Sequence, residues 1–187
     1  VIPDGNRRWA QSQGMSPEAS YRPAIAHLDW LLGELWPGNC TTLSFWWGSV
    51  ANLRHRPSGQ VDEIRESLIW WLRERAPEAL RRHGADLRMV GRWRELCPGL
   101  EDFLPEPLPG AQRRLNLLFA YDGRDELRAA ADRLGGGGRS EEAFQEALWL
   151  GGSPPVDLVI RTGSAGHLSA GFMLWWIAEA QLAFTAT

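Results

Sequence analysis

The sequence contains no lysine, and all 20 of its basic residues are arginines. With 23 acidic residues the formal net charge is −3, which argues against a broad electrostatic grip on nucleic acid or on an anionic membrane. Two cysteines, Cys40 and Cys97, are too few for a disulfide framework or a metal cluster, so we expect a cytoplasmic protein. No apolar run approaches the roughly 18 residues typical of a membrane span, so no stable membrane insertion is expected.

The chain is long enough for one domain. Its 187 residues, 44% of them hydrophobic, fit a single domain with a substantial core, which we expect to span residues 1–187. Val1 and Ile2 are typical of the end of a strand, so we expect the N-terminal end to be truncated. This composition excludes a disordered chain and a two-domain arrangement.

Short apolar runs alternate with segments of helical periodicity. We predict strands at 41–47, 85–90, 114–121 and 156–160, and a last short strand near the C-terminus. We predict helices at 18–36, along a face marked by residues 61–72, at 94–104, after 123, at 141–150 and at 172–180. This alternation predicts an α/β fold with a mostly parallel central sheet, helices on both faces, and a ligand site beyond the carboxyl ends of the strands.

The segment from Asp4 to Arg8 lies where a strand end meets a helix start. Free backbone N–H groups there, together with Arg7 and Arg8, favour a phosphate-like anion. The Asp4 carboxylate would repel that anion unless a cation lay between them, and carboxylate, phosphate and water oxygens are the ligands that Mg²⁺ prefers. Gly5 permits close approach of the backbone. On spacing alone, an N-capping turn with solvated arginines is the more common explanation.

Arg161 begins a second polar loop, which follows the predicted strand at 156–160 and runs to Ser169. Because the carboxyl ends of parallel strands share one edge of a sheet, we expect this loop on the same rim as Asp4. Two anion sites on one rim suggest two phosphorylated substrates. Taken alone, an arginine after a strand more often forms a surface ion pair.

Ser49 and Asn52 follow the predicted strand at 41–47, and Arg54 and Arg56 come shortly after them. Hydroxyl and amide groups at a strand end can orient a substrate or hydrogen-bond a phosphate. An ordinary polar turn is the favoured explanation when the segment is taken alone.

Eleven tryptophans are the most unusual feature of the composition, and six of them form the pairs at 46–47, 70–71 and 175–176. Large rings bury much area, so most should lie in the core. Since neighbouring positions point in different directions, each pair should supply one core residue and one that faces elsewhere. The functional alternative is an apolar pocket shortened by bulky rings, with walls formed by Phe45, Trp46, Trp47 and Trp70.

Five segments occur in a characteristic order: Asp4-Gly5-Asn6-Arg7-Arg8-Trp9-Ala10, the loop ending in Asn52, residues 116–124, residues 155–163 and residues 174–178. Together they resemble the cis-prenyltransferases, the family of undecaprenyl diphosphate synthase. The resemblance covers nearly the whole chain and favours the phosphate interpretation of the first segment.

The resemblance implies a homodimeric enzyme that transfers allylic prenyl groups, with a hydrophobic tunnel between helices and sheet. Asp4 would hold Mg²⁺ on the allylic diphosphate, while Asn52, with Ser49 beside it, would serve the condensation step and the loss of a proton. The implied substrate-binding residues are Gly5, Asn6, Arg7, Arg8, Trp9, Tyr21, Arg54, Arg56, Arg161, His167 and Ser169, with Phe45, Trp46, Trp47 and Trp70 around the prenyl group.

The chain departs from the family pattern at charged positions. The departures are Pro17, Tyr21, His167 and Gln181. The first two replace an arginine and a histidine after the first helix, and the third replaces the second arginine of the Arg161 loop. The fourth replaces a glutamate by which the partner chain helps to place the metal, and Glu179 is an alternative for that contact. Because the sequence stops before the family's C-terminal segment, we expect that end to be truncated too.

The Ser-Val-Ala-Asn sequence at 49–52 and the Asp-Gly-x-Arg-Arg-Trp pattern resemble lavandulyl-type members such as cyclolavandulyl diphosphate synthase. These join prenyl units head to middle, with dimethylallyl diphosphate as acceptor. We therefore expect a short-chain synthase that forms a branched, lavandulyl-like C10–C15 diphosphate. The alternatives are a head-to-tail short-chain synthase that uses isopentenyl diphosphate, a non-catalytic partner subunit and a prenyl-binding carrier. Prenyl diphosphates are the expected ligands, and nucleic acid is not expected.

Overall fold

The computed structural model describes residues 1–135, 140–163 and 165–186. Its helices are α1 (Asn6–Ser12), α2 (Tyr21–Leu35), α3 (Val50–His55), α4 (Ser58–Glu74), α5 (Ala76–His83), α6 (Trp93–Leu96), α7 (Gly123–Leu134) and α8 (Glu141–Ala147), with 3-10 turns η1 (Glu18–Ser20) and η2 (Leu100–Phe103). Its strands are β1 (Thr42–Gly48), β2 (Ala85–Val90), β3 (Arg113–Phe119), β4 (Leu158–Arg161) and β5 (Gln181–Phe184).

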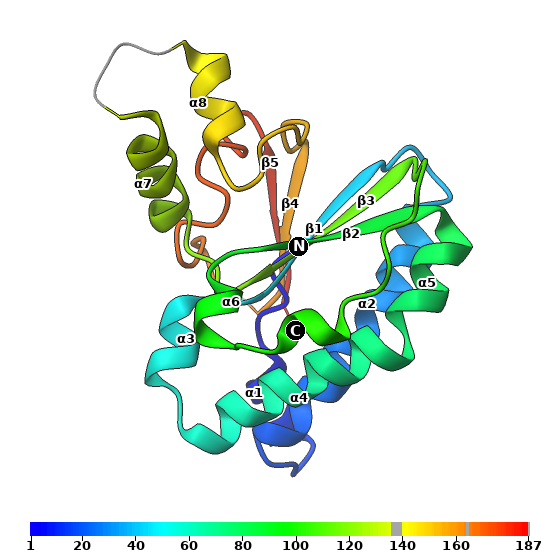
Figure 1. Ribbon diagram of the computed structural model, residues 1–187. Helices are drawn as coiled ribbons and strands as arrows, with labels where there is room; N and C mark the ends of the chain where they lie inside the picture. Colours follow the sequence, from blue (N-terminus) through cyan, green and yellow to red (C-terminus); the bar gives the residue numbers. More distant parts are fainter. Residues whose placement is uncertain (136–139, 164, 187) are drawn as a thin grey trace.

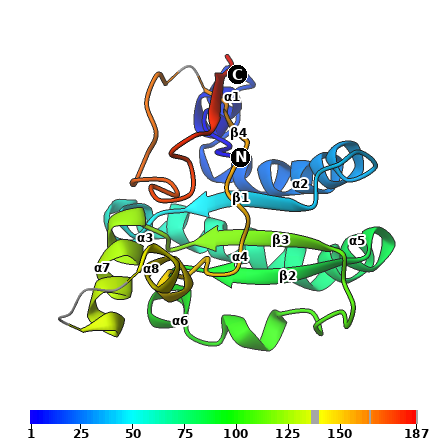
Figure 2. The same cartoon turned by 90° about the horizontal axis from the view of Figure 1, so that it is seen from above.

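All five strands pair in parallel, in one group of three strands and one of two. β3 lies between β1 and β2, as Figure 2 shows from above, while β4 pairs with β5. Residues 1 and 2 join the two groups, because Trp46 N–H donates to the Val1 carbonyl (3.0 Å) and Ile2 N–H donates to the Ile160 carbonyl (2.8 Å). The carboxyl ends of β1 and β4 therefore flank the segment that leads into α1.

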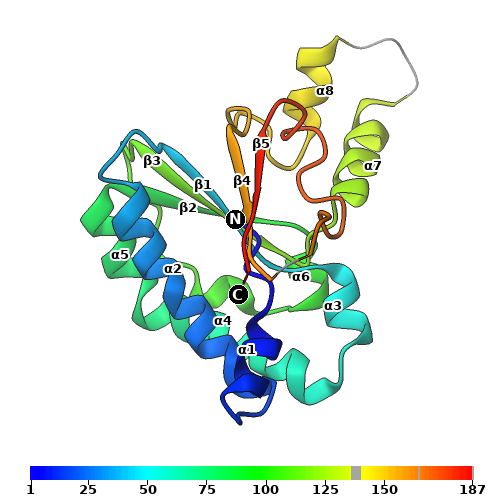
Figure 3. The ribbon, with the colours of Figure 1, turned by 180° about the vertical axis from the view of Figure 1, so that it is seen from behind.

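Alternation along β3 divides the core into two layers. Leu115, Leu117 and Phe119 pack into the cluster with α2, α4 and α5, whereas Leu118 packs into a cluster that includes Ala130 of α7. Successive residues of a strand point to opposite faces, so each face receives its own helices. Figures 1 and 3 show α2, α4 and α5 on one side of the strands and α7 and α8 on the other. The predicted α/β fold with a parallel sheet is confirmed.

The tryptophan pairs behave as the sequence predicts. Trp47, Trp71 and Trp176 are buried, while their neighbours at 46, 70 and 175 are only partly buried. Each pair thus gives one ring to the core. The remaining buried tryptophans are Trp36 and Trp93, and Trp30 is 60% exposed.

Two segments differ from the prediction. Residues 172–180 form a series of turns instead of a helix, and the backbone adopts positive φ at Ala170 (50°), Gly171 (54°) and Met173 (48°). These left-handed residues interrupt helical hydrogen bonding. A Cβ on Gly123 would lie 1.8 Å from the Gly171 carbonyl oxygen, so α7 fixes this path by close backbone contact. Conversely, helix α3 occupies the segment after Ser49, where the sequence predicts only a polar loop.

Across the residues that the structure describes, no helix combines the length and the apolar character needed to cross a bilayer.

Candidate functional site

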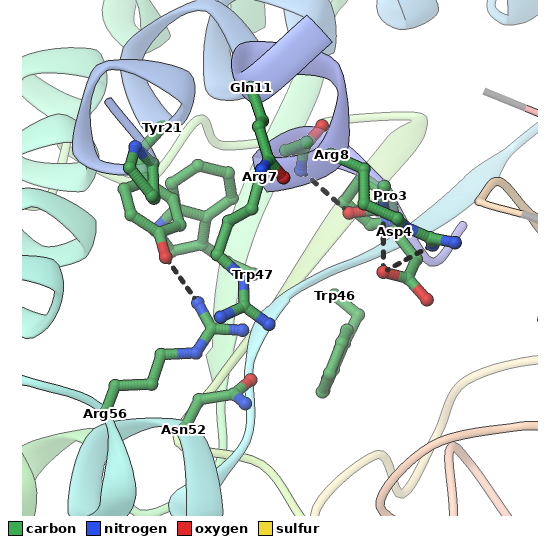
Figure 4. Close-up of a pocket in the computed structure, with 13 residues that line it drawn as sticks. Pro3, Asp4, Arg7, Arg8, Gln11, Tyr21, Trp46, Trp47, Asn52 and Arg56 are labelled. Atoms are coloured by element: carbon green, nitrogen blue, oxygen red, sulfur yellow. Dashed lines mark hydrogen bonds and ion pairs between the residues drawn. The ribbon is translucent and has the colours of Figure 1, made fainter. Parts of the chain in front are cut away.

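A polar cavity of about 570 Å³ lies beside the start of α1 (Figure 4). Elements α1, α2, β1 and α3 all contribute to its walls, so segments far apart in the sequence meet here. Predicted residues that line the cavity are Asp4, Gly5, Asn6, Arg7, Arg8, Tyr21, Trp46, Trp47, Asn52 and Arg56, and they are joined by Pro3, Gln11 and Pro17. The sheet rim thus brings most of the predicted residues together.

The turn into α1 presents Asp4 to this cavity. Gly5 precedes the helix with φ of 97°, in the left-handed region that glycine adopts readily. Asn6 fastens the turn, because its side-chain amide donates to the Pro3 carbonyl at 2.9 Å. The side chain of Thr162 donates to the Asp4 carbonyl at 2.5 Å, which ties the turn to the end of β4.

The Asp4 carboxylate is surrounded by donors. One oxygen accepts from Arg161 Nη2 at 2.7 Å, the other accepts from Gly5 N–H at 2.7 Å, and Arg8 Nη2 lies 3.7 Å away. Burial alone would raise the pKa of Asp4, but the hydrogen bonds from Arg161 and Gly5 and the charges of Arg161 and Arg8 outweigh it and hold the pKa below its ordinary value. The carboxylate is therefore ionised at neutral pH.

Arg161 organises the neighbouring loop from a buried position, with 4% of its surface exposed. Its Nη1 donates to the Ser169 hydroxyl at 2.9 Å and to the His167 carbonyl. Its Nε is buried without a hydrogen-bond partner among the described residues. The His167 side chain is exposed, so this residue serves the site through its backbone. The predicted set of Arg161, His167 and Ser169 is thus assembled around the guanidinium next to Asp4.

Gly163 locks this loop against the turn at Asp4. Its φ is 89°, and a Cβ there would lie 2.8 Å from both Arg8 Nη2 and Gly5 N. The guanidinium of Arg8 also donates to the Gly163 carbonyl. A side chain larger than hydrogen at this position would push the two loops apart.

Ser49 and Asn52 form the capping box of α3. The Ser49 hydroxyl accepts from Asn52 N–H at 3.0 Å, and Asn52 Oδ1 accepts from Ser49 N–H at 3.2 Å. Ser49 is buried and its hydroxyl serves the helix, whereas Asn52 lines the cavity. The Nδ2 amide of Asn52 is then the group of this pair that can donate to a ligand.

At the far side of the cavity, Tyr21 and Arg56 form a pair. Arg56 Nη1 donates to the Tyr21 hydroxyl at 2.6 Å, and this hydroxyl donates to Gln60 Oε1 at 3.4 Å. Burial is the main reason that the pKa of Tyr21 lies above, and that of Arg56 below, its ordinary value. The positive charge of Arg7 lowers the pKa of Arg56 further.

Arg54 and Trp70 are among the predicted residues that do not line the cavity. Arg54 pairs with Glu95, at 3.8 Å between Nη2 and Oε1, and the guanidinium of Arg22 packs over Trp70, 4.5 Å from the ring centroid. Because each side chain already has a partner elsewhere on the surface, the structure brings neither to the expected substrate site. Of the two predicted arginines after Asn52, only Arg56 lines the cavity.

Trp9 and Phe45 line a second, apolar cavity of about 540 Å³ beside α2. Asp4 and Asn6 border both cavities, so the turn before α1 is the wall between them. Phe45 stacks on Trp47, with 6.4 Å between the ring centroids. Of the predicted pocket walls, Trp46 and Trp47 thus line the polar cavity, whereas Phe45 borders the apolar one.

Gln181 and Glu179 are exposed, and neither lines the cavity beside Asp4. Gln181 pairs with Leu158 at the start of β4, whereas Arg161 lies at the end of that strand. The described residues contain no group of three or more histidine, cysteine, aspartate or glutamate side chains that could hold a metal ion. Asp4 alone therefore fits a cation that arrives with phosphate ligands, as Mg²⁺ does in sites with one or two carboxylates.

Gln11 is a cavity residue that the sequence reasoning missed. It stands four residues after Arg7 on α1, and residues spaced by four share one face of a helix. This spacing is the signal that could have identified it.

Residues 2–187 match the family model described as "Putative undecaprenyl diphosphate synthase". The chain is 31% identical over 201 residues to an isoprenyl transferase of Leptospira interrogans, with all of the chain and 82% of the relative covered. A solved structure of lavandulyl diphosphate synthase from Lavandula x intermedia in complex with dimethylallyl diphosphate matches with a TM-score of 0.88 at 22% identity, over 98% of the chain and 84% of that protein. A probable undecaprenyl diphosphate synthase from Campylobacter jejuni matches with a TM-score of 0.74 at 27% identity, over 100% and 84%.

Proposed function

Because the chain belongs to the undecaprenyl diphosphate synthase family of prenyltransferases, we propose that it condenses two short allylic diphosphates head to middle. The product would be a branched, lavandulyl-like C10–C15 diphosphate, released together with inorganic diphosphate. Dimethylallyl diphosphate is the proposed acceptor, and a C5 or C10 allylic diphosphate is the proposed donor.

The packed interior of the protein supports the proposal that the product is short. The layer between the sheet and α2, α4 and α5, where the resemblance places a tunnel, holds the buried rings of Trp36, Trp71 and Phe45. Trp46 and Trp47 wall the polar cavity next to this layer. A long prenyl chain could enter this layer only by displacing these side chains, and displacing a well-packed core is costly. Outside the layer, the apolar cavity of about 540 Å³ beside α2 limits the length of the group it can hold. A five- or ten-carbon group needs no such displacement.

Two observations support the head-to-middle part. The polar cavity lacks charge at Pro17 and Tyr21, which favours a second diphosphate site unlike that of a chain-elongating enzyme. The fold is also close to that of a protein named lavandulyl diphosphate synthase, which was solved with dimethylallyl diphosphate.

In the proposed reaction, the allylic C–O bond of the donor breaks and its electron pair leaves with the diphosphate. The double bond of the acceptor supplies the electrons of the new C–C bond, and the acceptor then loses a proton. Arg7, Arg8 and Arg56 would hold the departing diphosphate, and the Asn52 amide would orient the acceptor. Asp4 would hold Mg²⁺, which when bound would neutralise charge on the leaving group.

We further propose a homodimer. β5 pairs only with β4 among the described residues, and it exposes Leu182 (49%) and Phe184 (42%). Exposed apolar side chains on a strand at a sheet edge favour association. Light scattering of the purified protein tests this: a mass of one chain would contradict it.

Product analysis tests the coupling mode. The purified protein should receive Mg²⁺ with dimethylallyl or geranyl diphosphate alone, and in parallel with isopentenyl diphosphate added. Branched products from the allylic substrates alone, identified by mass spectrometry after dephosphorylation, are the expected result. Products that form only when isopentenyl diphosphate is present would instead show a head-to-tail synthase, which the retained Arg161 and Ser169 favour.

A further inference from the structure

The positive charges of the polar cavity are distributed unevenly. At one end, Arg8 and Arg161 surround the Asp4 carboxylate, so the positive charge there is partly compensated. At the other end, neither Arg7 nor Arg56 forms an ion pair with a carboxylate in the described part of the chain. Figure 4 shows both guanidinium groups directed into the cavity, next to each other. Two adjacent cations repel, and an anion between them would relieve that repulsion.

Tyr21 supplies the fixed point for this uncompensated end. It is the first residue of α2, only 5% exposed, and its ring packs edge-on against Trp47 with 6.4 Å between centroids. Its hydroxyl accepts from Arg56 Nη1 at 2.6 Å, and the Arg56 guanidinium carbon lies 5.8 Å from the ring centroid. The rigid phenol therefore holds one end of a flexible arginine.

The tether has a physical benefit. A free arginine side chain carries about 2 kcal/mol of rotamer entropy, and a preorganised guanidinium loses less of it when it binds a ligand. Because the Tyr21 hydroxyl accepts from Arg56 and donates its only proton to Gln60, it has no donor left for a phosphate oxygen. Tyr21 is thus suited to act through Arg56 rather than to touch the ligand. Pro17, on the same wall, has no side-chain donor.

We propose that Tyr21 is a positioning residue whose hydroxyl aims Arg56 toward Arg7, so that the two guanidinium groups form a seat for the diphosphate of a substrate. This inference rests on the proposed function for the identity of the ligand. The seat needs two neighbouring negative phosphate groups to span both cations, so it should favour a diphosphate over a monophosphate.

Calorimetric titration with inorganic pyrophosphate, in a chelating buffer without divalent metal, tests the proposal. Tyr21→Phe removes only the hydroxyl and should weaken binding about tenfold, which corresponds to about 1.4 kcal/mol. Arg56→Met should weaken it by more, and the double variant should bind no worse than Arg56→Met, because Tyr21 has nothing left to position. The preference for pyrophosphate over inorganic phosphate should narrow in Tyr21→Phe.

Matched controls separate positioning from general structural damage. Tyr121→Phe also removes a buried hydroxyl, but one that contacts Glu126 and does not line the cavity, and Arg65→Met removes an exposed arginine of α4. Both should bind pyrophosphate as the unmodified protein does.

In turnover assays, Tyr21→Phe should raise KM for the allylic substrate with little change in kcat. If Tyr21→Phe proves unfolded by circular dichroism, Gln60→Ala, which removes the other partner of the hydroxyl, takes its place with a weaker effect in the same direction.

Several outcomes would overturn the proposal. Unchanged pyrophosphate affinity in Tyr21→Phe, or additive losses in the double variant, would show that the hydroxyl does not act through Arg56. A protein that forms prenyl products but binds pyrophosphate equally well with and without the hydroxyl would refute this inference and leave the proposed function standing. A protein that binds pyrophosphate through Tyr21 and Arg56 but forms no prenyl product would refute the proposed function alone.

Discussion

Two carboxyl groups of this protein, Asp4 and Glu126, lie in opposite surroundings. Asp4 borders the cavity, its side chain is 34% exposed, and Arg161 and Arg8 keep its pKa low. Glu126 is 1% exposed, where it accepts from the Tyr121 hydroxyl at 2.5 Å and from Leu150 N–H at 3.0 Å. Burial raises the pKa of Glu126, and the hydrogen bonds and the charge of Arg88 only partly oppose that effect.

The difference separates a functional carboxylate from a structural one. Glu126 connects the end of β3, helix α7 and the segment at residue 150, so its contacts stabilise the fold. Asp4 keeps its charge at the edge of a cavity, beside Arg8, which a ligand can also reach. A charge that the protein compensates but does not fully bury remains available for chemistry.

The largest expected effect is a loss of prenyl-transfer activity when Asp4, but not Glu126, is replaced. Asp4→Asn keeps the shape of the side chain but removes its charge, so prenyl transfer should fall by at least about 100-fold. Thermal unfolding of Asp4→Asn should shift less than that of Glu126→Gln, because the amide oxygen of asparagine can still accept from Arg161. Glu126→Gln should instead lower the thermal stability of the fold, with turnover largely retained. Full activity in Asp4→Asn would contradict the role assigned to the cavity.

Replacement of Arg161 tests how far the cavity depends on its buried cation. Arg161→Met leaves Asp4, Ser169 and the His167 carbonyl without their common donor. Removing one partner of a buried pair is strongly destabilising, and since Asp4 is one-third exposed we expect a loss of about 2 to 3 kcal/mol. Urea denaturation measures this change. A loss below about 0.5 kcal/mol, as for a surface pair, would show that the loop does not depend on Arg161.

Trp46→Ala should alter the product rather than the fold. The ring is partly buried and lines the cavity, so its removal makes room for additional carbons. Given Mg²⁺ and allylic diphosphates, the variant should accept a longer donor, which competition between geranyl and dimethylallyl diphosphate measures. Trp176→Ala, in the core near Glu126, should instead destabilise the protein by about 3 to 5 kcal/mol. An unchanged donor preference in Trp46→Ala would show that this ring does not limit length.

The smallest effect is a pair of opposite pH dependences. Asp4 has a lowered pKa, so its contribution to stability is present above its ordinary pKa of 3.8 and is lost as the pH falls through the lowered value. Glu126 has a raised pKa, so its contribution is present below its ordinary pKa of 4.5 and is lost as the pH rises through the raised value. Denaturation from pH 3 to 7 should therefore show the stability advantage over Asp4→Asn shrinking toward low pH. The stability advantage of the unmodified protein over Glu126→Gln should shrink toward high pH. If both stability advantages changed in the same direction with pH, the comparison between the two carboxyl groups would be contradicted.

The sequence predicted the strands and the Asp4 turn because these depend on local patterns. Apolar runs bounded by polar residues identified β1, β2 and β3. Asp4, Arg7 and Arg8, which are close in the sequence, all line the cavity. Helix α3 was missed although Ser49 and Asn52 have the spacing of a capping box. That signal was visible but was assigned to a substrate-orienting loop.

Other features depend on contacts that no local pattern contains. The apolar segment at 172–180 has helical composition, but its path is set by close contact with Gly123 and by positive φ at Met173. The sequence does not predict the environment of Trp70, because it depends on the Arg22 guanidinium that packs over the ring. The bond between Tyr21 and Arg56 joins residues 35 positions apart, so it follows from the packing of α2 against α4, which begins at Ser58, shortly after Arg56.

The most direct test of the central claim is a crystal structure with Mg²⁺ and a thiolodiphosphate analogue of dimethylallyl diphosphate, which cannot ionise readily. We predict the diphosphate group between Arg7 and Arg56, the metal ion on the Asp4 carboxylate, and the five-carbon group against Trp46. An analogue bound elsewhere, with the polar cavity empty and Asp4 contacting neither metal nor diphosphate, would contradict the account.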